Sequence, residues 1–187
     1  MNLRFMPLEL EDILEVKALT DLLIGKDYYS YMDLARLHKN GLFKKTQLSF
    51  VIKDKNTIVG CRLTLAPGTW IDSKKVDPNS WDVNNNDNVA YFQSVFLKKE
   101  YMGKGMGSKV SKHVLNLLRN LKVEAVVCHS HLESINNSSQ KYLLKLGFQN
   151  LNTYQDFWKE VDYDCSTCCK ETCVCSASEM IYYLEDK

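Results

Sequence analysis

Three glycines alternate with other residues in the segment Tyr101-Met-Gly-Lys-Gly-Met-Gly-Ser108, which we call the glycine segment. An apolar, β-branched run, Val89–Leu97, precedes it, and apolar residues at helical spacing follow it as far as Leu121. The glycines therefore lie where a strand turns into a helix. Glycines let a ligand approach the backbone, and the first turn of a helix presents unpaired N–H donors at its positive dipole end. The segment is expected to hold a phosphate or pyrophosphate group.

The glycine segment does not fit two common phosphate-binding loops. A P-loop requires Gly-Lys-Ser/Thr after its second glycine, whereas Gly107-Ser108-Lys109 reverses the last two positions. A dinucleotide fingerprint requires an acidic residue roughly 20 positions later at a strand end, but Glu124 stands at the start of the next expected strand. The alternative to a phosphate-binding loop is that the three glycines only make a tight turn and bind no ligand.

Five of the seven cysteines lie between Cys165 and Cys175. A C-x-x-C pair that faces a C-x-C pair across a hairpin can place four sulfurs around one tetrahedral metal ion. The natural ligands are Cys165, Cys168, Cys173 and Cys175, which leaves Cys169 spare. We expect one structural zinc, because four thiolates leave the ion no open position. Disulfide pairing and a redox-sensitive loop are the alternatives.

The composition is that of an ordinary globular protein of 187 residues, with 45% hydrophobic residues and a formal net charge of +1. This length suits one domain with a substantial core. The small net charge argues against a field that would attract nucleic acid or acidic membranes. No signal peptide and no membrane span are indicated. We expect a single cytoplasmic domain over residues 1–187, with a cysteine-rich hairpin connection at 163–178.

The elements that position these residues follow from hydrophobic periodicity and turn signals. The expected order is β α α β β β α β α β β, which predicts an α/β sandwich with a mixed sheet. Strands are expected at Leu3–Pro7, Gln47–Lys53, Thr57–Leu65, Val89–Leu97, Glu124–His129, Gln155–Asp162 and Glu179–Glu185. Helices are expected at Glu9–Ile24, Tyr31–Lys39, Met106–Leu121 and Asn136–Leu146. Ala66–Asn88 is expected to be a long loop that packs through two tryptophans.

The glycine segment resembles the acetyl-CoA loop of the GNAT superfamily of N-acetyltransferases. The family pattern is Arg or Gln, two residues, Gly, any residue, then Gly or Ala. Gly105 and Gly107 match its glycines, and Tyr101 matches a tyrosine that precedes the loop. Met102 stands where the family has Arg or Gln.

The last expected helix resembles a second GNAT signature, Asn, then Ala or Ser, then Tyr, ending in Leu-Gly-Phe. The matching residues are Asn136, Ser139 and Leu146-Gly147-Phe148. Leu143 occupies the family's tyrosine position, and Tyr142 lies one residue earlier. The order of elements is also that of the family, so the resemblance covers nearly the whole chain.

The resemblance implies a GNAT-like α/β sandwich with a mixed, mostly antiparallel sheet flanked by helices. It also implies acetyl-CoA as cosubstrate, with its pantetheine arm along a strand edge. The residues expected to bind it are Val95, Phe96, Leu97, Met102, Gly103, Lys104, Gly105, Met106, Gly107, Ser108, Asn136 and Ser139. Helix capping and local hydrogen bonding are the alternative roles of Asn136 and Ser139.

Acyl transfer to an amine requires a base for the ammonium proton and stabilisation of the leaving thiolate. His131 stands where some family members place a glutamate, and a histidine with a near-neutral pKa suits the role of base. Glu133 is the competing base, and a solvent-exposed histidine without a role is the alternative for His131. Tyr142 is the expected acid. Otherwise the dipole of the last helix would stabilise the thiolate alone.

The sequence thus predicts an enzyme that transfers an acetyl group from acetyl-CoA to a primary amine by direct attack. The acceptor, a small molecule or a protein, stays open, and a homodimer is compatible with the chain. Two alternatives remain on the same fold. Met102 and Leu143 favour a non-catalytic module that binds acyl-CoA, and the cysteine hairpin favours a metal-responsive interaction module.

Overall fold

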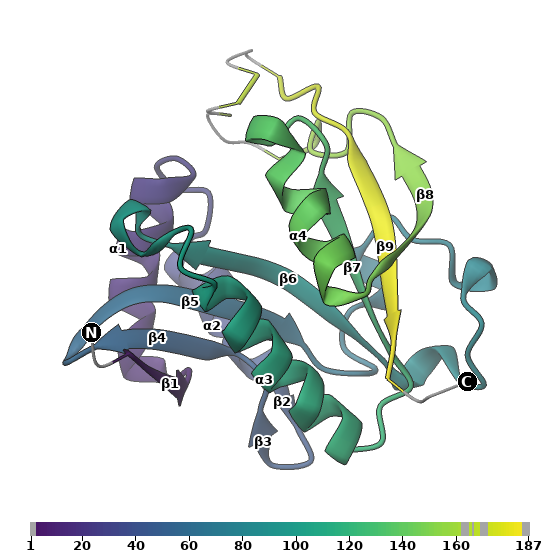
Figure 1. Ribbon diagram of the computed structural model, residues 1–187, viewed down its shortest axis with the longest axis horizontal. Helices are drawn as coiled ribbons and strands as arrows, with labels where there is room; N and C mark the ends of the chain where they lie inside the picture. The colour runs from purple at the N-terminus through teal and green to yellow at the C-terminus, as the bar shows by residue number, and fades with distance from the viewer. Residues whose placement is uncertain (1–2, 162–164, 166, 169–171, 185–187) are drawn as a thin grey trace.

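The structure is a computed structural model that describes residues 3–161, 165, 167–168 and 172–184. Its centre is a seven-stranded sheet in the order β1-β4-β5-β6-β7-β9-β8 (Figure 1). The strands are β1 (Leu3–Pro7), β4 (Phe50–Asp54), β5 (Thr57–Leu65), β6 (Val89–Leu97), β7 (Ala125–His131), β8 (Gln149–Tyr154) and β9 (Ala177–Tyr183). Neighbouring strands run antiparallel except β6 and β7, which run parallel. The expected mixed, mostly antiparallel sheet is confirmed.

Helices cover both faces of this sheet. They are α1 (Ile13–Leu23), α2 (Tyr31–Asn40), α3 (Met106–Asn120) and α4 (Ser138–Leu146). Figure 1 shows α3 and α4 in front of the sheet, with α1 and α2 behind it. No helix in the described ranges has the length and apolar character needed to cross a bilayer.

Shorter elements complete the fold. A two-stranded ribbon, β2 (Leu42–Phe43) with β3 (Thr46–Gln47), precedes β4 and was not expected from the sequence. The structure also contains short 3-10 helices at Leu10–Asp12, Ile71–Ser73, Pro78–Ser80, Asn86–Asn88, Lys99–Tyr101 and Ile135–Asn137.

The two helical layers bury alternate residues of the same strands. Phe50 and Ile52 of β4 pack in the cluster that contains α3 and α4, whereas Val51 packs in the cluster with α1 and α2. Successive side chains of a strand point to opposite faces, so a strand covered on both faces must be apolar throughout. In α3, Val110 and Val114 recur at the four-residue spacing that keeps them on the buried face.

The strands β6 and β7 pair only along their first halves. Their parallel register runs from Val89 opposite Ala125 to Phe92 opposite Cys128 and ends there. On the other side of β6 the register with β5 shifts between Leu63 and Thr64, which leaves Gln93 as an extra residue. Such a bulge bends a strand and increases its twist. The second halves of β6 and β7 therefore separate.

The expected strand Gln155–Asp162 is wrong for its described residues, which end at Val161. Residues 155–161 form turns, and the strand that pairs with β9 is the preceding segment, β8. The reason is that Phe157 and Trp158 place their rings against His129 and His131 rather than in the sheet. Asp162 and Glu185, which closed two expected strands, lie outside the described residues.

The long loop between β5 and β6 packs against the sheet, as its tryptophans led us to expect. The Trp70 ring packs against the rings of Trp81 and Tyr91, with ring centroids 5.7 and 4.8 Å away. The Trp70 indole donates a hydrogen bond to the carbonyl of Val89 (2.8 Å). The Trp81 indole donates to the carboxylate of Glu179 in β9 (2.8 Å), which is fully buried.

Candidate active site

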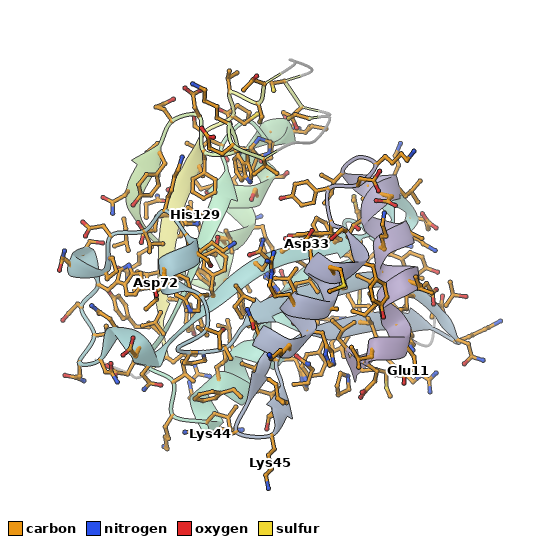
Figure 2. The ribbon with its side chains drawn as sticks, turned by 180° about the vertical axis from the view of Figure 1, so that it is seen from behind. Glu11, Asp33, Lys44, Lys45, Asp72 and His129 are labelled. Carbon is orange, nitrogen blue, oxygen red and sulfur yellow. The ribbon has the colours of Figure 1, made fainter. Side chains whose placement is uncertain are left out.

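A pocket of about 1030 Å³ occupies the opening between the separated halves of β6 and β7. At one end it is lined by the glycine segment, and we call this the glycine end. At the other it is lined by Tyr28, Tyr29, Tyr91, Phe157 and Trp158, and we call this the aromatic end. In the view from behind, Asp33 of α2 and His129 of β7 lie on opposite sides of the aromatic end (Figure 2).

The glycine end is shaped by left-handed backbone. Gly103 and Gly105 have φ values of 71° and 72°, and a Cβ at either position would meet no atom within 4 Å. The conformation therefore favours glycine, and the space beside both residues is open. Gly105 caps α3, whose first backbone hydrogen bond runs from Lys109 N to Gly105 O (3.0 Å). The N–H groups of the first turn have no acceptor within the helix, as at any helix N-terminus.

Most of the expected acetyl-CoA ligands line this pocket. They are Val95, Phe96, Leu97, Met102, Gly103, Gly105, Met106, Gly107, Ser108 and Ser139. Lys104 does not line it, because its ammonium donates to the carbonyl of Glu100 (2.7 Å). Asn136 is exposed on the turn before α4 and also lies outside the pocket lining. Ser139 accepts a hydrogen bond from the N–H of His131 through its hydroxyl (3.2 Å).

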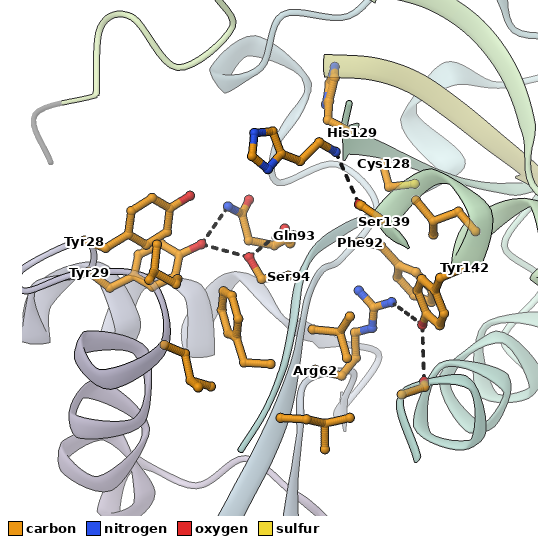
Figure 3. Close-up of a pocket in the computed structure, with 18 of the residues that line it drawn as sticks. Tyr28, Tyr29, Arg62, Phe92, Gln93, Ser94, Cys128, His129, Ser139 and Tyr142 are labelled. Atoms are coloured by element: carbon orange, nitrogen blue, oxygen red, sulfur yellow. Dashed lines mark hydrogen bonds between the residues drawn. The ribbon is translucent and has the colours of Figure 1, made fainter. Parts of the chain in front are cut away.

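A buried arginine that the sequence analysis missed lies on the floor of the pocket. Arg62 of β5 is 2% exposed and stacks on the ring of Phe92, with its guanidinium carbon 3.9 Å from the ring centroid. It donates to the hydroxyl of Ser111 in α3 (2.8 Å) and to that of Tyr142 in α4 (3.2 Å), as Figure 3 shows for Tyr142. Within the described residues no carboxylate forms a salt bridge with Arg62.

Tyr142 reaches the pocket from a helix position that the sequence analysis had questioned. Its hydroxyl contacts the Ser111 hydroxyl and donates to the carbonyl of Gly107 in the first turn of α3 (3.2 Å). Leu143, which occupies the family's tyrosine position, is buried and also lines the pocket. The phenol of Tyr142 therefore links α4, α3 and the Arg62 guanidinium.

His129 uses its ring for structural contacts. The Tyr91 hydroxyl lies 2.8 Å from its Nδ1, and the Phe157 ring lies 4.3 Å from its ring. Burial lowers the pKa of His129 to about 4, while the Lys75 backbone opposes this shift and the Lys74 cation adds to it. His129 is therefore neutral at physiological pH.

His131 is less enclosed than His129. Its Nε2 lies 3.6 Å from a carboxylate oxygen of Glu133, and its ring packs edge-on against Trp158 at 5.0 Å. Burial lowers the pKa of His131, and the Glu133 carboxylate opposes this shift. The Nε2 is buried and accepts no hydrogen bond from the described residues. Glu133 does not line the pocket, and it accepts a hydrogen bond from Ser176 N (2.9 Å).

The aromatic end also holds a polar cluster at the bulge of β6. The amide of Gln93 donates to the hydroxyl of Tyr29 (2.9 Å), which lies 3.1 Å from the hydroxyl of Ser94 (Figure 3). The side-chain amide oxygen of Gln93, Oε1, is buried and accepts no hydrogen bond from the described residues. Burial raises the pKa of Tyr29, so its hydroxyl stays protonated at physiological pH.

Cations outnumber anions at the aromatic end. Arg36 is paired with Asp33 (2.7 Å). Lys74 and Lys75 line the pocket without a carboxylate partner among the described residues. The Lys74 ammonium lies 5.3 Å from the Tyr91 ring centroid, and burial, with a contribution from Arg36, lowers the pKa of Lys74. Two cations without a described carboxylate partner therefore line this end of the pocket.

The four expected metal ligands lie together beside the aromatic end. Their sulfur atoms are all within 4.8 Å of one another; the residues are Cys165, Cys168, Cys173 and Cys175. No disulfide joins the described cysteines. Cys169, the expected spare thiol, lies outside the described residues.

The sequence model of the acetyltransferase (GNAT) family matches residues 16–148. No curated protein matches the sequence. Solved structures resemble the fold closely at low sequence identity. The ribosomal-protein-S18-alanine N-acetyltransferase from Escherichia coli superposes with a TM-score of 0.69 at 12% identity, over 99% of this chain and 96% of that chain.

Two further structures show the same likeness. Naa50 from Arabidopsis thaliana, in complex with the bisubstrate analogue CoA-Ac-MVNAL, has a TM-score of 0.65 at 13% identity, over 97% of this chain and 99% of that chain. An IAA acetyltransferase from Bacillus cereus has a TM-score of 0.67 at 15% identity, with the same shares covered. At these identities the likeness establishes the fold.

Proposed function

Because the chain belongs to the GNAT family of acetyltransferases, we propose that it transfers an acetyl group from acetyl-CoA to a primary amine. The observation that carries this proposal is the single pocket that joins the glycine end to the aromatic end through the gap between β6 and β7. Direct acyl transfer requires the thioester and the amine to meet in one chamber, approached from opposite ends. The Naa50 structure is a complex with the bisubstrate analogue CoA-Ac-MVNAL, and we infer that both substrates occupy the pocket together here.

The glycine end would bind the pyrophosphate of CoA. The N–H groups in the first turn of α3 have no acceptor within the helix, and the positive end of the helix dipole lies at the same place. Both features favour an anionic group there. The pantetheine arm would follow β6 beyond Phe92, where the backbone is no longer paired with β7. A backbone N–H in Val95–Leu97 would then donate to the thioester carbonyl and stabilise the oxyanion that forms during attack.

His131 would accept the ammonium proton of the acceptor. Its lowered pKa keeps the ring neutral at physiological pH, which is the form that accepts a proton. His129 suits this role less well, because its Nδ1 faces the Tyr91 hydroxyl. The free amine then attacks the thioester carbon and the C–S bond breaks. The nitrogen that now carries the acetyl group loses its second proton to the Tyr142 phenolate, which forms when Tyr142 protonates the leaving sulfur.

Tyr142 and Arg62 would receive the leaving thiolate of CoA. The Tyr142 hydroxyl would donate its proton to the sulfur, and the guanidinium 3.2 Å away would stabilise the phenolate that remains. The guanidinium is buried in a medium of low dielectric constant, so its attraction for the phenolate is stronger than it would be in water.

The acceptor would be an amine that also carries an anionic group. Lys74 and Lys75, which have no described carboxylate partner, would bind that group, and the buried side-chain Oε1 of Gln93 would accept a hydrogen bond from the amine. A matched pair of acceptors, an α-amino acid and the amine left when its carboxylate is removed, tests this charge preference. We expect a higher kcat/KM for the amino acid, and a smaller difference in the Lys74→Gln variant.

Detection of the free CoA thiol in a screen of amines tests the proposed reaction. The alternative is a module that binds acyl-CoA without turnover, and it is favoured by Met102 and Leu143 at positions where the family has polar residues. Titration calorimetry with acetyl-CoA separates the two functions. Binding together with thiol release supports the enzyme, whereas binding without release for any amine supports the module.

A further inference from the structure

The cysteine cluster beside the aromatic end is not used by the proposed reaction. Three of its members are almost fully buried: Cys165 is 6% exposed, Cys173 3% and Cys175 1%. The fourth, Cys168, is half-buried and packs against the others, as does Trp158. Four thiols that gather in this way from a short connection form a ready set of soft ligands.

The spacing of the sulfur atoms fits one tetrahedral ion. With zinc–sulfur bonds of about 2.3 Å, the sulfurs of a regular tetrahedron lie roughly 3.8 Å apart. The Cys165 and Cys175 sulfurs are 3.9 Å apart. A disulfide would bring two sulfurs to about 2.05 Å. The observed distance is compatible with two ligands on one ion and excludes a disulfide between these two cysteines.

The cluster is tied to the wall of the pocket by the backbone around it. The carbonyl of Cys175 accepts a hydrogen bond from Phe157 N (2.9 Å). Ser176, the next residue, donates from its N–H to Glu133 (2.9 Å) and accepts from Leu132 N (3.1 Å). Cys165 itself lines the pocket. An ion at this point would hold the turn that carries Phe157 against β7.

We propose that these four cysteines bind one structural Zn²⁺ ion through their thiolates. The ion cross-links the first and last parts of the connection between β8 and β9, because Cys165 and Cys168 precede Cys173 and Cys175 in it. It fixes Phe157 and Trp158 against the two histidines, and so it shapes the aromatic end of the pocket. This proposal does not depend on acetyltransferase activity.

A second ligand set competes for the same ion. His131, Glu133 and Cys175 also have ligand atoms within 4.8 Å of one another. Three mixed ligands would leave an open position and a reactive metal, whereas four thiolates close the site. The thiolate set is favoured because its members are more buried, and because Glu133 already accepts a hydrogen bond from Ser176 N.

Metal analysis of the full chain, purified without chelator, tests the proposal directly. We expect about one zinc per chain, and X-ray absorption at the zinc edge should give four sulfur neighbours at about 2.3 Å. A mercurial reagent that titrates thiols should release the zinc in step with the loss of four thiolates. Metal-free protein, another metal in place of zinc, paired disulfides, or nitrogen and oxygen neighbours would each overturn the proposal.

Two variants separate the site from general effects of removing a thiol. Cys168→Ser alters the ligand that is least buried, so the chain has the best chance of folding, and we expect zinc content and melting temperature to fall together. Cys61→Ala removes a buried thiol of β5 that lies outside the cluster and the pocket lining, and it should retain the full zinc content. Full zinc content in Cys168→Ser would contradict the four-thiolate site.

Discussion

The guanidinium of Arg62 lies 3.2 Å from the hydroxyl of Tyr142, although the two residues are 80 positions apart and belong to different layers of the fold. Arg62 extends from the central sheet, and Tyr142 from the helix that covers it. The cation is almost fully buried and contacts hydroxyls and the Phe92 ring. Burying a charge in this way is costly, and a buried charge at a pocket floor favours a role for Arg62 in the proposed reaction.

Arg62→Met should lower kcat by roughly 10²-fold while the Kd for acetyl-CoA changes little, because the lost interaction acts on the leaving group. Tyr142→Phe should have a similar effect, since it removes the proton that the cation helps to transfer. Steady-state kinetics with calorimetric binding measures both quantities. The double variant should be no slower than the slower single variant. Additive losses would mean that the two residues act separately.

His131→Gln should remove the acidic limb of the kcat/KM profile against pH. A base must be deprotonated to act, so activity should rise with pH through the pKa of His131. Burial lowers that pKa, so the rise should lie below pH 6.5, the ordinary value for histidine. His129→Gln is the matched control and should keep this limb, provided that it folds. An unchanged profile in His131→Gln would assign the base to Glu133 or to water.

Gly105→Val should abolish binding of acetyl-CoA in calorimetry, because the branched side chain would fill the space beside the first turn of α3. A β-branched residue at φ 72° also strains the backbone. Gly68→Val is the matched control, since Gly68 has φ 75° and equally open surroundings but lies outside the pocket lining. The control should lose similar stability and keep its affinity. Retained affinity in a folded Gly105→Val would exclude the glycine segment as the binding loop.

Glu179→Ala should lower the free energy of unfolding by about 3 kcal/mol, because a buried donor that loses its acceptor costs about 1 to 3 kcal/mol. The buried carboxylate accepts hydrogen bonds from Trp81, Asn152 and Tyr154, and all three donors would lose this acceptor. Denaturant unfolding measures the change.

Glu124→Ala is the control for that change. Its carboxylate accepts a hydrogen bond from Asn84 N of the same long loop, but at an exposed position (2.6 Å). We expect a loss of about 1 kcal/mol, as for an ordinary hydrogen bond. Equal losses in the two variants would show that burial of the Glu179 network adds no stability.

Local patterns predicted the parts of the site that are contiguous in the sequence. The position of the glycine segment could be predicted because glycines between a strand and a helix indicate both a tight turn and the kind of ligand that the turn can bind. The cysteine set could be named because its members lie within a few positions of one another. In both cases chain geometry over a short segment determines what lies together.

Residues that meet across the fold could not be predicted in this way. Arg62 occupies a strand position where an exposed charge is the ordinary expectation, and only the packing of α3 and α4 against β5 shows that it is buried. The burial of Glu179 could not be predicted either, because its hydrogen-bond partners come from two distant segments of the chain. The strand β8 was expected at Gln155–Asp162 rather than at Gln149–Tyr154. The true strand is mostly polar, whereas the turn after it contains Phe157 and Trp158, whose apolar rings suggested a strand.

The position of β9 has a consequence for how the protein is made. This strand follows β8 in the chain but lies between β7 and β8 in the sheet, and it supplies Glu179 to the long loop. On the ribosome, β7 and β8 must therefore emerge before the strand that joins them exists. Until residues 177–183 have been translated, β7 exposes an apolar edge, and such edges can pair with other chains. The last steps of folding should follow synthesis of β9, and long-range pairing of this kind is slow.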